Sequence, residues 1–87
     1  MAAITPNTVL RESTGSTTLL ICGFTQTTVN DTWTPSEVLP VLSYWAQAVG
    51  GLGINEPDTN YQTNTGTFTF VQGTSYGPFT LFILART

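Results

Sequence analysis

The side chains that most often carry enzyme chemistry are scarce in this sequence. Among its 87 residues there is no histidine, and Cys22 is the only cysteine. A Ser/His/Asp or Cys/His arrangement uses an imidazole as its general base, so the commonest hydrolytic mechanisms are excluded. Cys22 lies in the apolar run 19–24, where a thiol usually packs as a small, inert, buried hydrophobe. The sequence therefore predicts no catalytic residue and no enzyme.

The carboxylates and glycines of the sequence do not predict a catalytic or ligand-binding site either. Without imidazole a metal ion would need oxygen ligands, and the oxygen-rich cluster at 55–60 lacks the spacing of a calcium loop, so a solvated turn is favoured there. Glu37 and Glu56 could pair for glycoside hydrolysis, but Glu37 already fits a helix capping box. The glycines of residues 50–53 fit the end of a helix better than a phosphate loop, because no lysine follows them. We expect neither a metal nor a cofactor.

A row of threonines is the most regular polar feature. In a continuous strand Thr63, Thr65, Thr67 and Thr69 would share one face, and the phenylalanines at 68 and 70 would share the other. Such a row could order water at an ice surface, although a useful array needs several rows and Gly66 interrupts this one. We favour an exposed polar sheet face that can serve as an assembly contact.

Amphipathic aromatic side chains form a second set of interface candidates. Residues of this kind are enriched at binding hot spots and are equally common as lids over a core. Together with the four threonines, the interface candidates are Trp33, Tyr44, Tyr61 and Tyr76. Trp45 belongs to the same class of side chain. The sequence alone leaves both interpretations of these aromatics open.

Charge is sparse. Lysine and arginine together number 2, aspartate and glutamate 5, and the formal net charge is −3. Nucleic acid and anionic membranes require clustered cationic side chains, so neither is expected as a partner. About one residue in five is threonine, which suits a pleated sheet. An almost uncharged polar surface fits a protein that packs against neighbours, because interface cores are depleted of charge, and it also fits ordinary solvated β-structure.

Strands should position most of these side chains. Residues 8–14 and 17–25 are expected to form a hairpin. The second of these strands should be central in a sheet or covered on both sides, because its middle is apolar on both faces. Residues 61–65 and 67–72 flank a glycine and read as two further strands. The apolar stretch 79–86 predicts a final strand, again in an interior position.

One helix is expected between residues 34 and 49. Thr34 and Glu37 form a capping box, and apolar residues recur from Val38 to Val49 at helical spacing. Pro40 interrupts this pattern, so we expect a kinked helix or a short turn followed by a helix over 40–48. The predicted fold class is α+β, mainly antiparallel β with about five strands and one helix packed on the sheet, in a single domain spanning 1–87.

Six short segments, taken in their order along the chain, form a distinctive pattern of residue types. They are Arg11-Glu12-Ser13, Gly15-Ser16-Thr17-Thr18-Leu19, Asp31-Thr32-Trp33, Tyr44-Trp45-Ala46, Gly66-Thr67-Phe68-Thr69-Phe70 and Thr80-Leu81. In these features, which span most of its length, the chain resembles small structural proteins of tailed bacteriophages.

The resemblance implies a virion structural protein of the capsid decoration or cement type. Such a protein forms a homo-oligomer and binds other virion proteins such as the major capsid protein, and a neck or tail location is equally compatible. The resemblance also implies residence on the virion after synthesis in the host cytoplasm, and we expect no signal peptide or transmembrane segment. The alternative from the residues is a small carbohydrate- or ligand-binding module that uses exposed aromatics.

Overall fold

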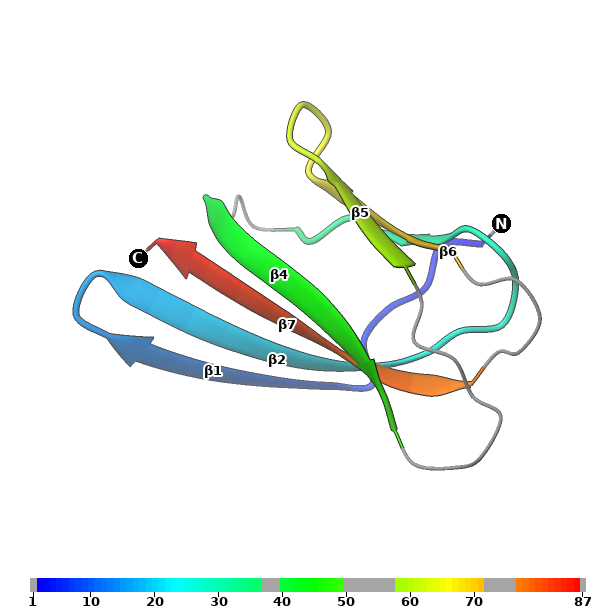
Figure 1. The fold of residues 1–87 in the computed structure, drawn as a ribbon, viewed down its shortest axis with the longest axis horizontal. Coiled ribbons are helices and arrows are strands. Elements are labelled where there is room, and N and C mark those ends of the chain that lie inside the picture. Colours follow the sequence, from blue (N-terminus) through cyan, green and yellow to red (C-terminus); the bar gives the residue numbers. More distant parts are fainter. Residues whose placement is uncertain (1, 37–39, 50–57, 72–76, 87) are drawn as a thin grey trace.

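The chain folds into two antiparallel β-sheets (Figure 1). The structure is a computed structural model and describes residues 2–36, 40–49, 58–71 and 77–86. A four-stranded sheet has the order β1-β2-β7-β4, and a three-stranded sheet has the order β3-β6-β5. The strands are β1 (Thr8–Thr14), β2 (Thr17–Thr25), β3 (Asp31–Trp33), β4 (Val41–Ala48), β5 (Asp58–Gln62), β6 (Thr67–Val71) and β7 (Pro78–Arg86).

The β1–β2 hairpin forms with the bounds that the sequence predicts. Thr14 pairs with Thr17, which leaves Gly15 and Ser16 as the turn. Gly15 has a φ of 63°, a conformation open to glycine at little cost and favoured at the first position of a two-residue hairpin turn. The interior positions predicted for β2 and β7 are also confirmed, because β2 lies between β1 and β7, and β7 lies between β2 and β4.

The core lies between the two sheets. Alternate residues of β2 and β7 point inward, as expected for strands with a side-chain period of two. They meet Phe68 and Phe70 of β6 and form one buried cluster with them. The ring centroids of Phe24 and Phe70 lie 5.2 Å apart, and those of Phe70 and Phe79 lie 4.7 Å apart. Aromatic packing therefore joins the four-stranded sheet to the three-stranded one.

The predicted α+β fold class is wrong, because the segment read as a helix is a strand. Residues 41–48 form β4, which pairs antiparallel with β7, and the described part of the chain contains no helix. Thr34, the proposed helix cap, instead shares a hydrogen bond between its hydroxyl and that of Thr67, at 2.8 Å. Glu37 and Val38 lie outside the described residues.

The error has a physical cause in the spacing of the apolar residues. Leu42, Trp45 and Val49 lie at the helical spacing on which the helix prediction rests, yet they are 49%, 46% and 48% exposed. In β4 it is Tyr44 and its alternate neighbours that face the core, while a bulge between Val41 and Ser43 obscures the period of two. β7 is apolar on both faces and gains a second hydrogen-bonded neighbour from β4.

A buried carboxylate organises the turn between β2 and β3. Asp31 is fully buried and accepts hydrogen bonds from the backbone amides of Ala2, Thr27 and Thr28, at 3.1, 2.8 and 3.1 Å. The hydroxyls of Thr27 and Thr28 donate to the same carboxylate. Asn30 completes the turn with a φ of 60°, which asparagine tolerates better than most residues. Asp31 thus connects the N-terminal segment to this turn.

Candidate interaction surface

The four-stranded sheet has a second face, opposite the core, which we call the outer face. It is formed by the residues of β2 and β7 that alternate with the buried ones. Each of these is half-buried except at the strand ends, where Thr25, Pro78 and Arg86 are exposed. The three-stranded sheet packs on the other side, through rings such as Phe70 against Phe24. No other strand of the described structure covers the outer face.

Two adjacent cross-strand rows make the centre of the outer face apolar. In the first row Leu10 lies opposite Ile21, Ile21 opposite Phe82, and Phe82 opposite Trp45. The rings of Phe82 and Trp45 stack, with centroids 5.1 Å apart and planes 9° apart. The second row runs Glu12, Leu19, Leu84 and Ser43. Leu10 is 64% exposed and Trp45 is 46% exposed, so these rows form an accessible apolar surface.

Polar residues border the apolar rows at both ends. One end carries the row Thr8, Gly23, Thr80 and Gln47, and the other carries Thr14, Thr17 and Arg86. Glu12 and Arg86 are the charged residues of the outer face. An apolar centre inside a polar, mostly uncharged rim is the usual anatomy of a protein–protein contact.

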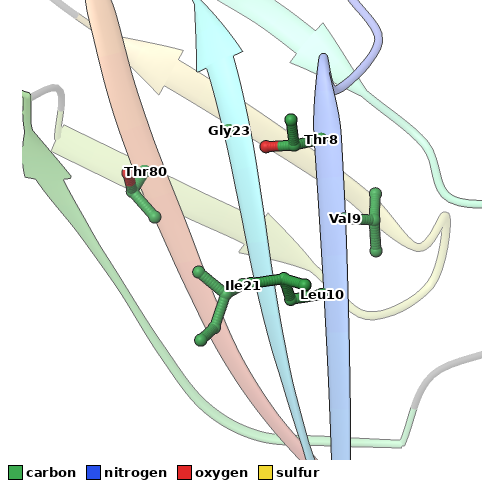
Figure 2. A pocket seen from close by; sticks show the side chains of 6 residues that line it. All are labelled: Thr8, Val9, Leu10, Ile21, Gly23 and Thr80. Carbon is green, nitrogen blue, oxygen red and sulfur yellow. The ribbon is translucent and has the colours of Figure 1, made fainter.

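Gly23 marks a hollow on the outer face. The open hollow has a volume of about 520 Å³ and is lined by Thr8, Val9, Leu10, Ile21, Gly23 and Thr80 (Figure 2). A Cβ at Gly23 would lie only 2.7 Å from Oγ1 of Thr8, so glycine is required there as long as Thr8 keeps its position. The lining has no charged side chain and offers hydroxyls and aliphatic groups only, which suits the side chain of a neighbouring protein.

Three of the predicted aromatic candidates are partly buried and pack against the core. Tyr44 and Tyr61 pack against each other and against Phe68, with centroid distances of 6.1, 5.7 and 4.4 Å for the three pairs. Trp33 packs against Phe24 and Phe68. The structure therefore places these rings as lids between the two sheets. Tyr76 lies outside the described residues.

The threonine row is divided between a turn and a strand. Thr63 and Thr65 are exposed in the turn between β5 and β6, and Gly66 closes this turn with a φ of 67°. Thr67 and Thr69 are half-buried in β6, facing away from Phe68 and Phe70. The four threonines consequently do not form one flat face.

Sequence reasoning missed the aliphatic part of the outer face. The sequence contains the signal, because the middle of β2 is apolar on both faces and β7 is apolar through residues 81–84. That pattern predicts a central position in the sheet or a cover on both sides for β2, and an interior position for β7. The structure confirms the central positions, and no other strand of the described structure covers the second face. Trp45 was noted only as one of several amphipathic aromatics.

The structure describes only some of the groups considered for chemistry. Cys22 is completely buried, and desolvation raises the pKa of its thiol to about 11, with Arg11 acting in the opposite direction. No group of three or more metal-ligating side chains occurs among the residues that the structure describes. Residues 55–57 of the oxygen-rich cluster, the glycines at 50–53 and both carboxylates of the proposed pair lie outside the described residues, whereas residues 58–60 belong to β5.

Comparisons with known proteins add no relative. No protein-family model matches the chain, and no curated protein and no solved structure matches it. Within the described ranges, no helix is long and apolar enough to cross a membrane.

Proposed function

We propose that this chain is a structural protein of a bacteriophage virion, of the capsid decoration type, which acts by associating with copies of itself and with the capsid shell. The observation that carries the assembly role is the outer face, where the apolar row from Leu10 to Trp45 and the adjacent pair Leu19 and Leu84 are open to contact. The virion assignment rests on the resemblance of the sequence segments to phage structural proteins.

The physical chemistry of the outer face supports a protein partner. Burying ionised groups is costly, and this face carries only Glu12 and Arg86. Its centre includes Trp45 and Phe82, and large aromatic residues are typical anchors of protein contacts. A small domain also gains stability by mass action when it binds a partner or a lattice in its folded form.

Particle binding tests this function. Mass spectrometry should detect the chain in purified particles of its source, and the purified protein should cosediment with shells assembled from the major capsid protein. Leu10→Glu and Trp45→Glu should each weaken cosedimentation about tenfold or more, because each puts a charge in the apolar rows through which copies of the chain associate, and a shell binds associated copies more tightly than single ones. Val29→Glu is the matched control, since Val29 is an exposed valine outside the strands. Absence from all particles would contradict the virion assignment.

A carbohydrate-binding module is the competing function, favoured by one observation. Trp45 stacks on Phe82 with one ring face and is 46% exposed, and a flat exposed aromatic ring can pack on a sugar. Titration with a panel of glycans, followed by tryptophan fluorescence, separates the two functions. Saturable quenching that Trp45→Phe reduces, in a protein that does not bind shells, would favour the sugar-binding module.

A further inference from the structure

We infer that the outer face is the contact of a symmetric dimer, in which two copies of this chain stack their four-stranded sheets face to face around a diagonal two-fold axis. The inference rests on the proposed function, because it names the surface through which the chain associates with itself. It follows from the size of the outer face, its apolar rows and the positions of its two charges.

The size of the outer face matches a stable contact. With strands about 4.8 Å apart and a rise of about 3.4 Å per residue, four strands of about eight residues project onto roughly 500 Å². Side chains such as Leu10 and Trp45 stand above the sheet, so the accessible area exceeds this projection. Stable interfaces bury roughly 800 Å² per partner, which is within reach of this face.

The apolar rows are compatible with a two-fold axis in the plane of the face. Such an axis places residue i of one copy over residue j of the other, and j over i. On the lattice set by the strand register, a diagonal axis can pass between Leu19 and Leu84 and then between Phe82 and Trp45. Leu19 then lies near Leu84 of the second copy, and Phe82 near Trp45 of the second copy.

The same axis pairs the two charges. Glu12 and Arg86 are separated within one copy, because β2 lies between their strands β1 and β7. Their midpoint falls on the axis just described, so Glu12 of each copy lies opposite Arg86 of the other. The dimer thereby gains two ion pairs at the rim of the contact and leaves no uncompensated charge on the face. The strands of the two sheets would cross at roughly 70°, closer to orthogonal than to aligned sheet packing.

Edge-to-edge pairing through β1 is the competing arrangement. β1 is exposed at every position and forms the edge of its sheet, at the margin of the molecule in Figure 1. Pairing two such edges would extend the sheet and leave both outer faces in water. The face-to-face arrangement covers the apolar rows, which is why the structure favours it.

Charge reversal with rescue tests the inference. Sedimentation equilibrium of the purified wild-type chain should show a monomer–dimer equilibrium. Glu12→Arg and Arg86→Glu should each weaken dimerisation about tenfold or more, because each places like charges opposite one another twice. The double variant Glu12→Arg/Arg86→Glu should restore the dissociation constant to within a few-fold of wild type. Asp58→Arg is the control for the change in net charge that Glu12→Arg makes, because Asp58 lies on β5 in the other sheet.

The outcomes separate this inference from the proposed function. A wild-type chain that is monomeric at all concentrations, or single variants that dimerise normally, would overturn the face-to-face dimer. Two weakened single variants without recovery in the double variant would also overturn it, provided that circular dichroism shows all variants folded. If the dimer is overturned while the chain still cosediments with shells, the virion function stands. If the charge-swap rescue succeeds and no particle contains the chain, the dimer stands and the virion function fails.

Discussion

Asp31 shows how one side chain can hold several segments of backbone together. Its carboxylate accepts hydrogen bonds from Ala2, Thr27 and Thr28, so that amides from the N-terminal segment and from the turn after β2 converge on two oxygen atoms. Burial acts to raise the pKa of this carboxyl, but the hydrogen bonds from Thr28 and Thr27 outweigh it, and the pKa lies below its ordinary value. A lowered carboxyl pKa makes stability depend on pH on the acid side.

We expect Asp31 to contribute to acid unfolding. Its contribution is complete above the unfolded-state pKa of about 3.9 and is lost as the pH falls through the lower folded-state pKa. Asp31→Asn should lower the melting temperature at neutral pH and flatten its fall between about pH 5 and about pH 2, because the amide cannot lose a proton in this range. Thermal melts across pH measure both effects. Parallel curves for the two proteins would show that Asp31 does not link stability to pH.

Cys22 allows a second test at the residue scale. It is completely buried, and desolvation raises the pKa of its thiol to about 11. We expect a thiol reagent at about pH 8 to leave the folded chain unlabelled and to modify one thiol per chain after denaturation. The raised pKa also predicts that stability declines as the pH rises from the unfolded-state value of about 8.5 towards 11. Rapid labelling of the native protein would show that the core opens at β2.

At the scale of elements, β4 provides the sharpest test of the fold, because Tyr44 and Trp45 are neighbours on opposite faces. Tyr44 packs on Tyr61 and Phe68 in the core, whereas Trp45 packs on Phe82 outside it. We expect Tyr44→Ala to lower the free energy of unfolding by about 2–4 kcal/mol and Trp45→Ala by about 1 kcal/mol, measured in denaturant titrations at low concentration. A larger loss for Trp45→Ala would mean that β4 presents Trp45 to the core and Tyr44 to the outer face.

Sequence reasoning succeeded where one pattern had one explanation. β1 and β2 were predicted with the correct bounds, and β7 to within one residue, because turn residues and strong apolar runs delimit them. β4 failed because apolar residues on its exposed face lie at helical spacing, and because its true period is broken at Leu42. The short β3 was missed because its formation depends on long-range contacts with β6 and on the buried Asp31, which no local pattern reveals.

The candidate surface was hidden from the sequence for a related reason. An apolar residue on an outer face can be of the same type as one in the core. Only the elements that pack against each face of the sheet distinguish the two. Leu20 and Leu19 are neighbours of the same type, yet Leu20 is buried in the core and Leu19 belongs to the outer face. Register and the position of the second sheet were needed to separate them.

For the molecule as a whole, the two faces of the four-stranded sheet play different parts. The inner face joins the three-stranded sheet through an aromatic cluster centred on Phe24, Phe68 and Phe70. The outer face carries a comparable set of large apolar side chains without such a cover in the described structure. A chain of this size buries only about two-thirds of its unfolded surface, so covering the outer face would add a large share of its stability.

Stability should consequently depend on protein concentration. If two folded chains bury their outer faces against each other, unfolding is coupled to dissociation of the dimer. A hundredfold rise in protein concentration should then raise the melting temperature by about 5–10 °C. Trp45→Glu should abolish this dependence, because it places a charge at the centre of the contact, whereas Val29→Glu should retain it. Scanning calorimetry over that concentration range measures the effect directly. A melting temperature that is constant for the wild-type chain would mean that the folded monomer carries its outer face uncovered, and that its stability comes from the contacts between the two sheets alone.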